Sequence, residues 1–384
     1  MTGKHTILTT HVGSMPRSQE VVDMLFAQDK GEPYDQAAFD TTIKAAVHDI
    51  VGKQQQAGVD VPSDGEMSKI SYATYIRHRL TGFEIGDAPR ATPKDLDEYP
   101  NYRDRLAKAG GTPKYHRPIC RGEITVKDMR PLEQDIANFK AALDAYGISE
   151  GFMNAASPGV IAVFQPDQYY NNFEKYLYAL AEVMKLEYEA IANAGLQLQI
   201  DCPDLAMGRH IKYRDEDDAT FLQYATMQVE ALNYALSEVP AERLRMHICW
   251  GNYEGPHTSD IDFAKIFELV MKAKPSQILF EASNPRHAHE WTVWRDHKDT
   301  LPEDKILVPG VVDTTTNFVE HPELIAERLE RFVDIVGPDR VMAGSDCGFG
   351  TFAGFGAIHP DICFAKLEAM RAGANLASER LAVA

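Results

Sequence analysis

The chain has 384 residues and a formal net charge of −18, and 44% of its residues are apolar and 25% charged. This composition is ordinary for a globular protein, and the length suits a large α/β barrel or two smaller domains. The acidity and the lack of a Lys/Arg cluster exclude a nucleic-acid-binding surface, and no apolar run reaches the roughly 18 residues of a membrane span. The first residues lack the apolar core of a signal peptide, and five cysteines, an odd number, do not suggest a disulfide framework. We therefore expect a cytoplasmic protein.

Short β-type runs that end in polar or glycine residues alternate with helical patterns along the chain. Eight such runs lie at 7–14, 59–66, 151–159, 196–204, 245–251, 277–283, 306–313 and 340–348. Amphipathic stretches at 171–195 and 321–337 separate later runs, and the second opens with Pro322 and closes with Gly337, as helices often do. The alternation predicts an α/β fold, a closed (β/α)8 barrel in a single domain over residues 1–384. A doubly wound open sheet is the alternative.

One segment, residues 86–118, interrupts the alternation. It is rich in proline, glycine and charge, and it is too long for an ordinary loop. A run at 119–126 has the pattern of a strand that returns from it. We interpret the segment as an insertion that covers one end of the barrel or forms a subunit contact in a homo-oligomer; a disordered excursion is the alternative.

The C-terminal strand ends of such a barrel form its active site, and here they carry metal-binding residue types. His247 and Cys249 stand two residues apart on one run, so they point to the same face, and Glu281 and Cys347 end other runs. One imidazole, two thiolates and one carboxylate suit a tetrahedral Zn2+ ion, and Glu281 is the ligand best suited to leave when a substrate sulfur arrives. The alternative is that the cysteines are small buried core residues.

Other polar residues at the strand ends are candidates for substrate binding and proton transfer. The substrate-binding candidates are Gly13, Ser14, Arg17, Glu66 and Asp201. Arg17 suits a substrate carboxylate or sulfonate, although a structural salt bridge is an equal alternative. Asp313 and Asp346 are the candidates for handling a proton during catalysis.

The chain resembles the catalytic domain of cobalamin-independent methionine synthase, from "TTHVGSMPR" at 9–17 to "GSDCGFGT" at 344–351. The resemblance implies a (β/α)8 barrel and a zinc ion held by His247, Cys249, Glu281 and Cys347. It also implies that Gly13-Ser14 and Gly65-Glu66 bind the carboxylate and amine of an amino acid, and it matches Asp201 in "IDCP" to an aspartate of the family.

Three departures concern the side of the site that binds methyl-folate. The family's ring-stacking Asn-Trp pair has no counterpart, Thr315 stands where the family has a proton-delivering histidine, and Cys202 replaces a carboxylate. The length also leaves no room for the N-terminal barrel of the full-length synthases. A related branch, similar to epoxyalkane:coenzyme M transferase, keeps the metal but opens an epoxide with a thiolate.

We therefore predict a zinc-dependent S-alkyltransferase that uses a small-molecule thiol and an alkyl donor. Zn2+ binds the thiol and keeps it ionised, and the thiolate attacks the donor carbon. Methyl transfer to homocysteine or a similar thiol is the first interpretation, and thiolate addition to an epoxide is the second. The further alternatives are a metal-free barrel similar to uroporphyrinogen decarboxylase and a non-catalytic zinc-binding or methyl-carrier protein.

Overall fold

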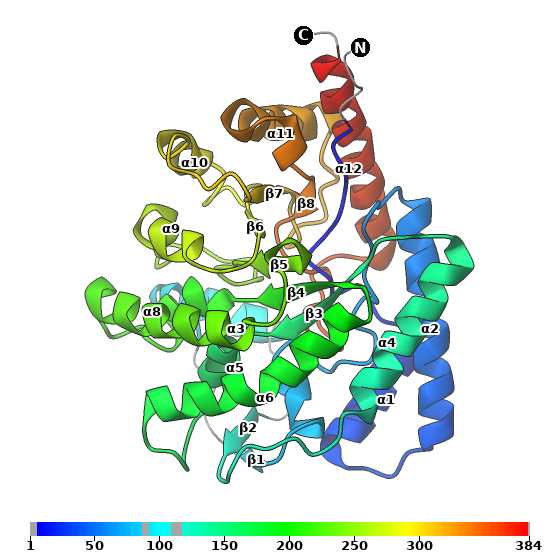
Figure 1. Ribbon diagram of the computed structural model, residues 1–384, viewed down its shortest axis with the longest axis vertical. Helices are drawn as coiled ribbons and strands as arrows, with labels where there is room; N and C mark the ends of the chain where they lie inside the picture. The colour runs from blue at the N-terminus through cyan, green and yellow to red at the C-terminus, as the bar shows by residue number, and fades with distance from the viewer. Residues whose placement is uncertain (1–5, 87–91, 109–116, 383–384) are drawn as a thin grey trace.

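The computed structural model describes residues 6–86, 92–108 and 117–382. Parallel strands form a curled sheet in the order β3-β4-β5-β6-β7-β8, and helices surround it (Figure 1). The strands are β3 Phe152–Ala156, β4 Gln197–Asp201, β5 Leu244–His247, β6 Gln277–Glu281, β7 Ile306–Val312 and β8 Gly344–Ser345. They correspond to the last six of the eight predicted runs.

Two irregular segments close this sheet into a barrel. Thr9 forms a parallel bridge with Ala343, next to β8, and Ser63 forms one with Phe152 in β3. The backbone N–H of Val61 donates to the carbonyl of Thr9 at 3.1 Å and thereby joins the two segments to each other. The first two predicted runs thus occupy the two remaining barrel positions, and the predicted (β/α)8 barrel is confirmed.

These two segments are not regular strands because their polar side chains compete for the backbone. The hydroxyl of Thr9 donates to the carbonyl of Gly58 at 2.8 Å, that of Thr10 to Val61 at 2.9 Å and that of Ser63 to Gly13 at 2.8 Å. Local side-chain bonds of this kind replace ladder bonds, and Pro62 has no N–H to offer to a ladder.

Helices that follow the strands form the outer layer of the barrel. They are α1 Gln19–Lys30, α2 Gln36–Gln56, α4 Arg130–Tyr146, α5 Pro158–Phe164, α6 Phe173–Asn193, α7 Gly208–Ile211, α8 Asp218–Ala235, α9 Phe263–Met271, α10 Trp291–Asp296, α11 Pro322–Val336 and α12 Pro360–Leu381. Short 3-10 helices are η1 Thr74–His78, η3 Pro203–Leu205, η4 Ala241–Arg243 and η5 Pro338–Arg340. The helices predicted at 171–195 and 321–337 are α6 and α11. None of the helices in the described ranges is long and apolar enough to cross a membrane.

The register of the parallel strands sets inward-facing residues of neighbouring strands side by side in layers. The parallel register pairs Gln199 of β4 with Arg245 of β5, and Asp201 with His247. Alternate residues of a strand face the same side, so Arg245 lies one layer below His247 in the barrel. An apolar cluster that includes Phe152 fills part of the interior, and the Arg245 guanidinium lies 3.7 Å from the Phe152 ring centroid. The barrel is therefore packed below the face at which its strands end.

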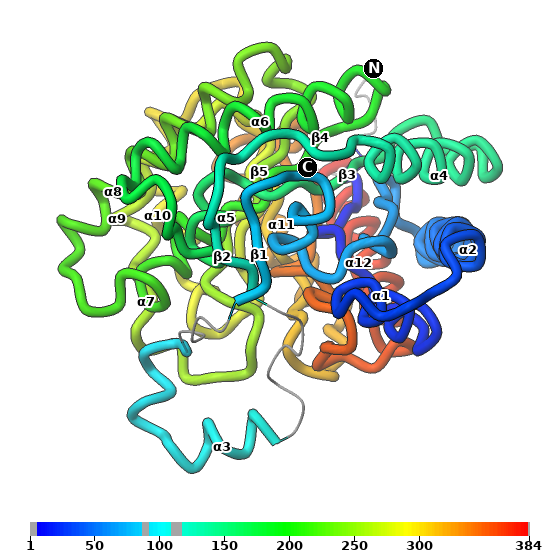
Figure 2. The backbone as a smooth tube through the Cα atoms, turned by 90° about the horizontal axis from the view of Figure 1, so that it is seen from below, coloured from blue at the N-terminus to red at the C-terminus, as the bar shows by residue number. Residues whose placement is uncertain are grey.

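The insertion lies beside that face. Its described part contains η2 Lys94–Glu98 and α3 Pro100–Lys108, and it is bounded by β1 Phe83–Gly86 and β2 Arg117–Cys120, which pair antiparallel. Residues 87–91 and 109–116 of the predicted insertion lie outside the described residues. The returning strand ends earlier than the predicted 119–126. Figure 2 shows α3 at the rim of the molecule, near α7.

Candidate active site

Three of the four predicted metal ligands lie together at the C-terminal face of the barrel. His247 ends β5, Cys249 follows it, and Cys347 follows β8. All three are buried, and one ligand atom from each lies within 4.8 Å of the other two. One imidazole nitrogen and two sulfurs at this spacing fit a tetrahedral zinc ion. The metal-ligand assignment itself stays a prediction.

The strand register orients His247. Asp201, its partner on β4, places Oδ1 3.4 Å from His247 Nδ1. Asn154 Nδ2 donates to the other oxygen of Asp201 at 3.0 Å, which fixes that carboxylate. A carboxylate behind an imidazole is the usual way in which proteins orient a histidine ligand. The other ring nitrogen, His247 Nε2, contacts the carbonyl of Asp346 at 3.3 Å, next to Cys347. Asp201, predicted to bind substrate, therefore also contacts a candidate metal ligand.

The two thiols lie within hydrogen-bonding distance of each other. Their sulfur atoms are 3.6 Å apart, too far for a disulfide, and the backbone N–H of Gly251 donates to Cys249 Sγ at 3.2 Å. The Cys249 thiol donates to Cys347 and the imidazole of His247 also contacts it, so the pKa of Cys347 is lowered to about 6, although burial opposes this. The pKa of Cys249 is raised, because Cys249 is the donor of that bond and is buried. The site is thus prepared to hold negatively charged sulfur.

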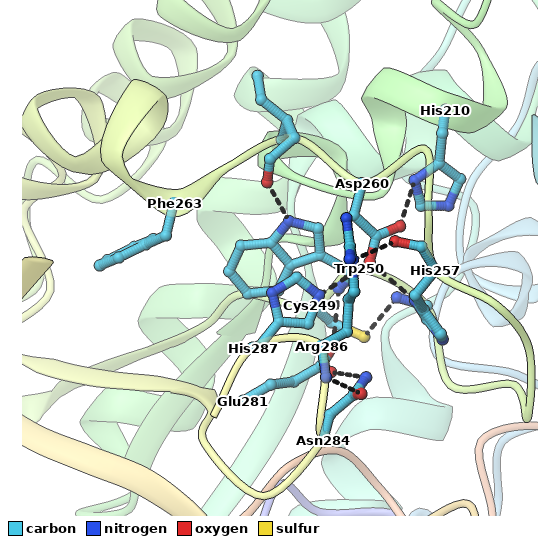
Figure 3. Close-up of polar contacts among 12 residues, drawn as sticks. His210, Cys249, Trp250, His257, Asp260, Phe263, Glu281, Asn284, Arg286 and His287 are labelled. Carbon is cyan, nitrogen blue, oxygen red and sulfur yellow. Dashed lines mark hydrogen bonds and ion pairs between the residues drawn. The ribbon is translucent and has the colours of Figure 1, made fainter. Parts of the chain in front are cut away.

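Glu281, the fourth predicted ligand, is held apart from this cluster. Its Oε1 accepts from the backbone N–H of Trp250 at 2.9 Å and its Oε2 accepts from Asn284 Nδ2 at 2.9 Å (Figure 3). Glu281 does not belong to the group of ligand atoms that lie within 4.8 Å of one another. A carboxylate that already has two protein donors suits a ligand that exchanges with a substrate sulfur.

A cavity of about 370 Å³ opens onto the cluster. Glu66 lines it, is 2% exposed, and has an Oε2 atom with no hydrogen-bond partner among the described residues. Burial is the main cause that raises the pKa of Glu66 to about 8, and Lys69 opposes the shift. Its φ of 55° is rare for a residue with a side chain. A strained, unpaired acid in a cavity is a candidate site for a substrate cation.

The other predicted substrate residues have different positions. Ser14 lines the cavity, and Gly13 has φ 136° and leaves no room for a Cβ, which would lie 2.1 Å from Asn154 Oδ1. Arg17 does not line the cavity. Its Nη2 donates to the carbonyl of Glu66 at 2.7 Å and its Nη1 to that of Gly350 at 2.5 Å. Arg17 therefore holds the backbone of the Glu66 loop in place.

The two candidates for proton transfer are both occupied by local hydrogen bonds. Asp313 accepts from the backbone N–H groups of Thr315 at 3.0 Å and Thr316 at 2.8 Å, and from both of their hydroxyls. Asp346 accepts from three backbone N–H groups, those of residues 282 to 284, at 2.6–2.9 Å. Neither aspartate lines the cavity. Their geometry is that of residues that shape turns, and Asp346 fixes the loop that follows Glu281.

Sequence reasoning did not identify Asn252 or the aromatic wall of the cavity. Asn252 Nδ2 donates to the carbonyl of Gly348 at 2.8 Å, so it holds the loop of Cys347. The aromatic wall includes Tyr72, Phe164, Phe352 and Phe355. No motif marks these residues, because they come from three distant segments and become neighbours only in the folded chain.

The remaining cysteines do not line the cavity. Cys120, Cys202 and Cys363 are buried and unpaired, and none of them lines it. Trp250, which follows Cys249, is 1% exposed and donates from its indole to the carbonyl of Ile261 at 2.7 Å, so it packs in the interior.

Comparison with known proteins places this arrangement in a family. Residues 7–375 match the family model described as cobalamin-independent synthase, catalytic domain. The chain belongs to the catalytic-domain family of cobalamin-independent synthases. A methionine synthase of Saccharolobus solfataricus is 25% identical over 381 residues, which cover 97% of this chain and 95% of that protein. A methionine synthase of Sulfolobus acidocaldarius is 24% identical over 352 residues, 91% of this chain and 87% of that protein.

A solved structure supports the same fold. A B12-independent methionine synthase from Shewanella sp. W3-18-1, in complex with selenomethionine, superposes with a TM-score of 0.74 at 18% identity and covers 99% of this chain and 100% of that one. At this identity the likeness concerns the barrel alone. The family membership supports the resemblance drawn from the motifs.

Proposed function

We propose that this protein is a zinc-dependent S-alkyltransferase that methylates an amino-acid thiol of the homocysteine type. One observation carries the proposal: the buried cluster of His247, Cys249 and Cys347 opens onto a cavity that also contains the unpaired carboxylate of Glu66. The curated relatives in its family are methionine synthases.

The zinc ion would be held by His247, Cys249 and Cys347, with Glu281 as the exchangeable fourth ligand. A bound zinc would supply the positive charge that keeps a substrate thiol ionised near neutral pH. Glu66 binds the substrate's ammonium group, while Ser14 lies where the substrate's polar end enters. Asp201 keeps the ring of His247 in position. These residues fix the sulfur with its attacking side toward the open part of the cavity.

We further propose that the methyl donor is a small, activated molecule rather than methyl-folate. The described residues that line the cavity include no tryptophan and no histidine besides His247. Thr315, where the family has a proton-delivering histidine, donates to Asp313 instead. A hydroxyl does not titrate near neutral pH, so Thr315 cannot deliver the proton that such a donor requires.

We propose that the chain is one catalytic domain and that the insertion acts as a lid. Thr92, Leu96, Arg103 and Leu106 of the insertion line the cavity. Tyr253 donates its hydroxyl to Asp95 at 2.9 Å, which fastens the insertion to the loop after β5. The unpaired cysteines are typical of a reducing compartment, so the cytoplasm is the proposed location. Homo-oligomer formation remains a proposal, and we expect no nucleic-acid or membrane partner.

The test measures the thioether product by mass spectrometry. Homocysteine, 4-mercaptobutyrate, which lacks the amine, and coenzyme M are each incubated with a methyl donor and the zinc-loaded protein. We expect product with homocysteine, much less with the other two thiols, and none after Cys249→Ser or Cys347→Ser. Cys363→Ser is the matched control and should retain activity. Equal product from metal-free protein or from the Cys347→Ser variant contradicts the proposal.

A further inference from the structure

A second cluster of metal-binding residues lies behind the first site, outside the cavity. His257 and Asp260 belong to the loop between β5 and α9, and His287 belongs to the loop between β6 and α10. Their ligand atoms all lie within 4.8 Å of one another. Asp260 Oδ2 is 2.8 Å from His257 Nδ1 and 2.8 Å from His287 Nε2 (Figure 3).

The outward nitrogens of both imidazoles have partners of their own. His257 Nε2 contacts the carbonyl of Tyr253 at 3.1 Å, and His287 Nδ1 contacts Glu290 Oε2 at 3.0 Å. The other oxygen of Glu290 accepts from the backbone N–H of Phe263 at 2.8 Å. An imidazole that donates its outward N–H to a carbonyl or carboxylate presents an inward lone pair, as metal-ligating histidines do.

A third histidine approaches the same aspartate. His210 comes from α7 and is 1% exposed, and its Nδ1 lies 3.1 Å from Asp260 Oδ1. Neither nitrogen of His210 nor that aspartate oxygen makes an aligned hydrogen bond within the described chain. A buried polar group without a partner costs about 1–3 kcal/mol. A cation between these residues would satisfy both the nitrogen and the oxygen.

We propose that His257, Asp260 and His287 form a second zinc site, closed and structural. His210 lies outside this group of ligand atoms and would move in as the fourth ligand. Three imidazoles and one carboxylate are a common zinc ligand set. Ligand atoms around a tetrahedral zinc lie about 3.3 Å apart, so the contacts to Asp260 would open by roughly 0.5 Å. The two carboxylates, Asp260 and Glu290, balance the charge of one Zn2+ ion.

A metal-free ion-pair cluster is the alternative. Burial lowers the pKa of His287, but the hydrogen bonds to Asp260 and Glu290 outweigh it and raise the pKa to about 10. The pKa of His257 is also raised, by its bond to Asp260 against burial. Two protonated imidazoles would then balance the same two carboxylates. In this state the contact between His210 and Asp260 stays without an aligned hydrogen bond.

The position of the cluster indicates what such a metal would do. The His287 ring stacks on Trp250, with ring centroids 4.1 Å apart, and Trp250 donates its backbone N–H to Glu281. His257 adopts φ 54°, a strained conformation that a metal ligand bond would hold in place. A metal here would join the loops that carry Cys249 and Glu281.

Metal content per chain tests the proposal. After zinc loading and dialysis, we expect about two zinc ions in the unmodified protein and about one in the Cys249→Ser/Cys347→Ser double variant, which leaves the second cluster intact. The His257→Gln/His287→Gln variant should also hold about one, and His289→Gln, an exposed neighbour, should hold about two.

Cobalt substitution identifies which site is filled. A thiolate-to-cobalt charge-transfer band should persist in the His257→Gln/His287→Gln variant and disappear in the double cysteine variant, whose remaining cobalt should show only ligand-field bands. If the His257→Gln/His287→Gln variant does not fold, the metal content of the double cysteine variant alone tests the second site. Retention of essentially no zinc or cobalt by that folded variant overturns the second site and leaves the proposed thiol chemistry untouched.

Discussion

Replacing Glu66 by glutamine separates the charge of this side chain from its shape. In the folded protein the pKa of Glu66 is raised to about 8, mainly by burial. An acid that binds protons more tightly in the folded than in the unfolded chain lowers stability as pH rises between the two pKa values. The destabilisation is therefore absent below about pH 4.5 and complete above about pH 8.

The magnitude follows from the size of the shift. A rise in the pKa of Glu66 from its usual value to about 8 lowers the free energy of unfolding by roughly 4–5 kcal/mol above pH 8. The effective dielectric of a protein interior reduces such a penalty, so we expect Glu66→Gln to raise the free energy of unfolding by about 2–3 kcal/mol at about pH 8.5 and hardly at all at about pH 5. Denaturant unfolding of the unmodified protein and of the variant measures this difference in the free energy of unfolding. Both proteins should be free of metal, because a nearby cation would lower the pKa of Glu66.

The same substitution should weaken thiol binding selectively. Loss of a charge-assisted hydrogen bond to the substrate ammonium costs about 1.5–3 kcal/mol, or roughly 10- to 100-fold in the dissociation constant. Homocysteine should lose this affinity, whereas 4-mercaptobutyrate should not. Isothermal titration of the zinc-loaded proteins gives both values. A variant that is no more stable at high pH, or that weakens both thiols equally, refutes the assignment of Glu66 as an unpaired amine-binding acid.

Three further predictions concern the metal ligands, the orientation of the His247 ring and the methyl donor. Cys249→Ser and Cys347→Ser should each lose the zinc of the thiol site, and Cys363→Ser should retain it, as metal analysis would show. Asp201→Asn should weaken zinc binding at that site by about 10- to 100-fold in a chelator competition, because the amide no longer anchors the imidazole of His247 as a carboxylate does; unchanged affinity contradicts this role. With homocysteine as acceptor, an activated small methyl donor or an epoxide should give a thioether and methyl-folate little or none, and robust methionine formation from methyl-folate contradicts the donor proposal.

The barrel was predictable because strand and helix periodicity are local properties of the sequence. The eight runs correspond to the eight barrel positions, but the first two are irregular, since Thr9, Thr10 and Ser63 bond to the backbone locally. Hydrophobic periodicity does not report which N–H and C=O groups a side chain will occupy. The predicted pattern therefore gave the topology and missed the form of these two segments.

Part of the candidate site could also be predicted from the sequence, and part of it could not. His247, Cys249 and Cys347 could be brought together from their places at strand ends, because parallel strands present their C-terminal ends to one face. The hydrogen bonds of Asp313 and Asp346 could not be predicted, since strand-end position says where a carboxylate lies and not which donors it meets. Arg17 is a similar case, because its guanidinium turns toward backbone carbonyls that belong to distant loops.

The loop after β5 connects the thiol site to the insertion. It carries Cys249, and Asp95 of the insertion accepts from the Tyr253 hydroxyl at 2.9 Å and from the backbone N–H of His257 at 2.6 Å. His257 in turn contacts Asp260. Packed protein segments move as units rather than deform continuously. If the insertion acts as the proposed lid, we expect its displacement to break the contacts of Asp95 with Tyr253 and His257 and thereby to loosen the loop that carries Cys249.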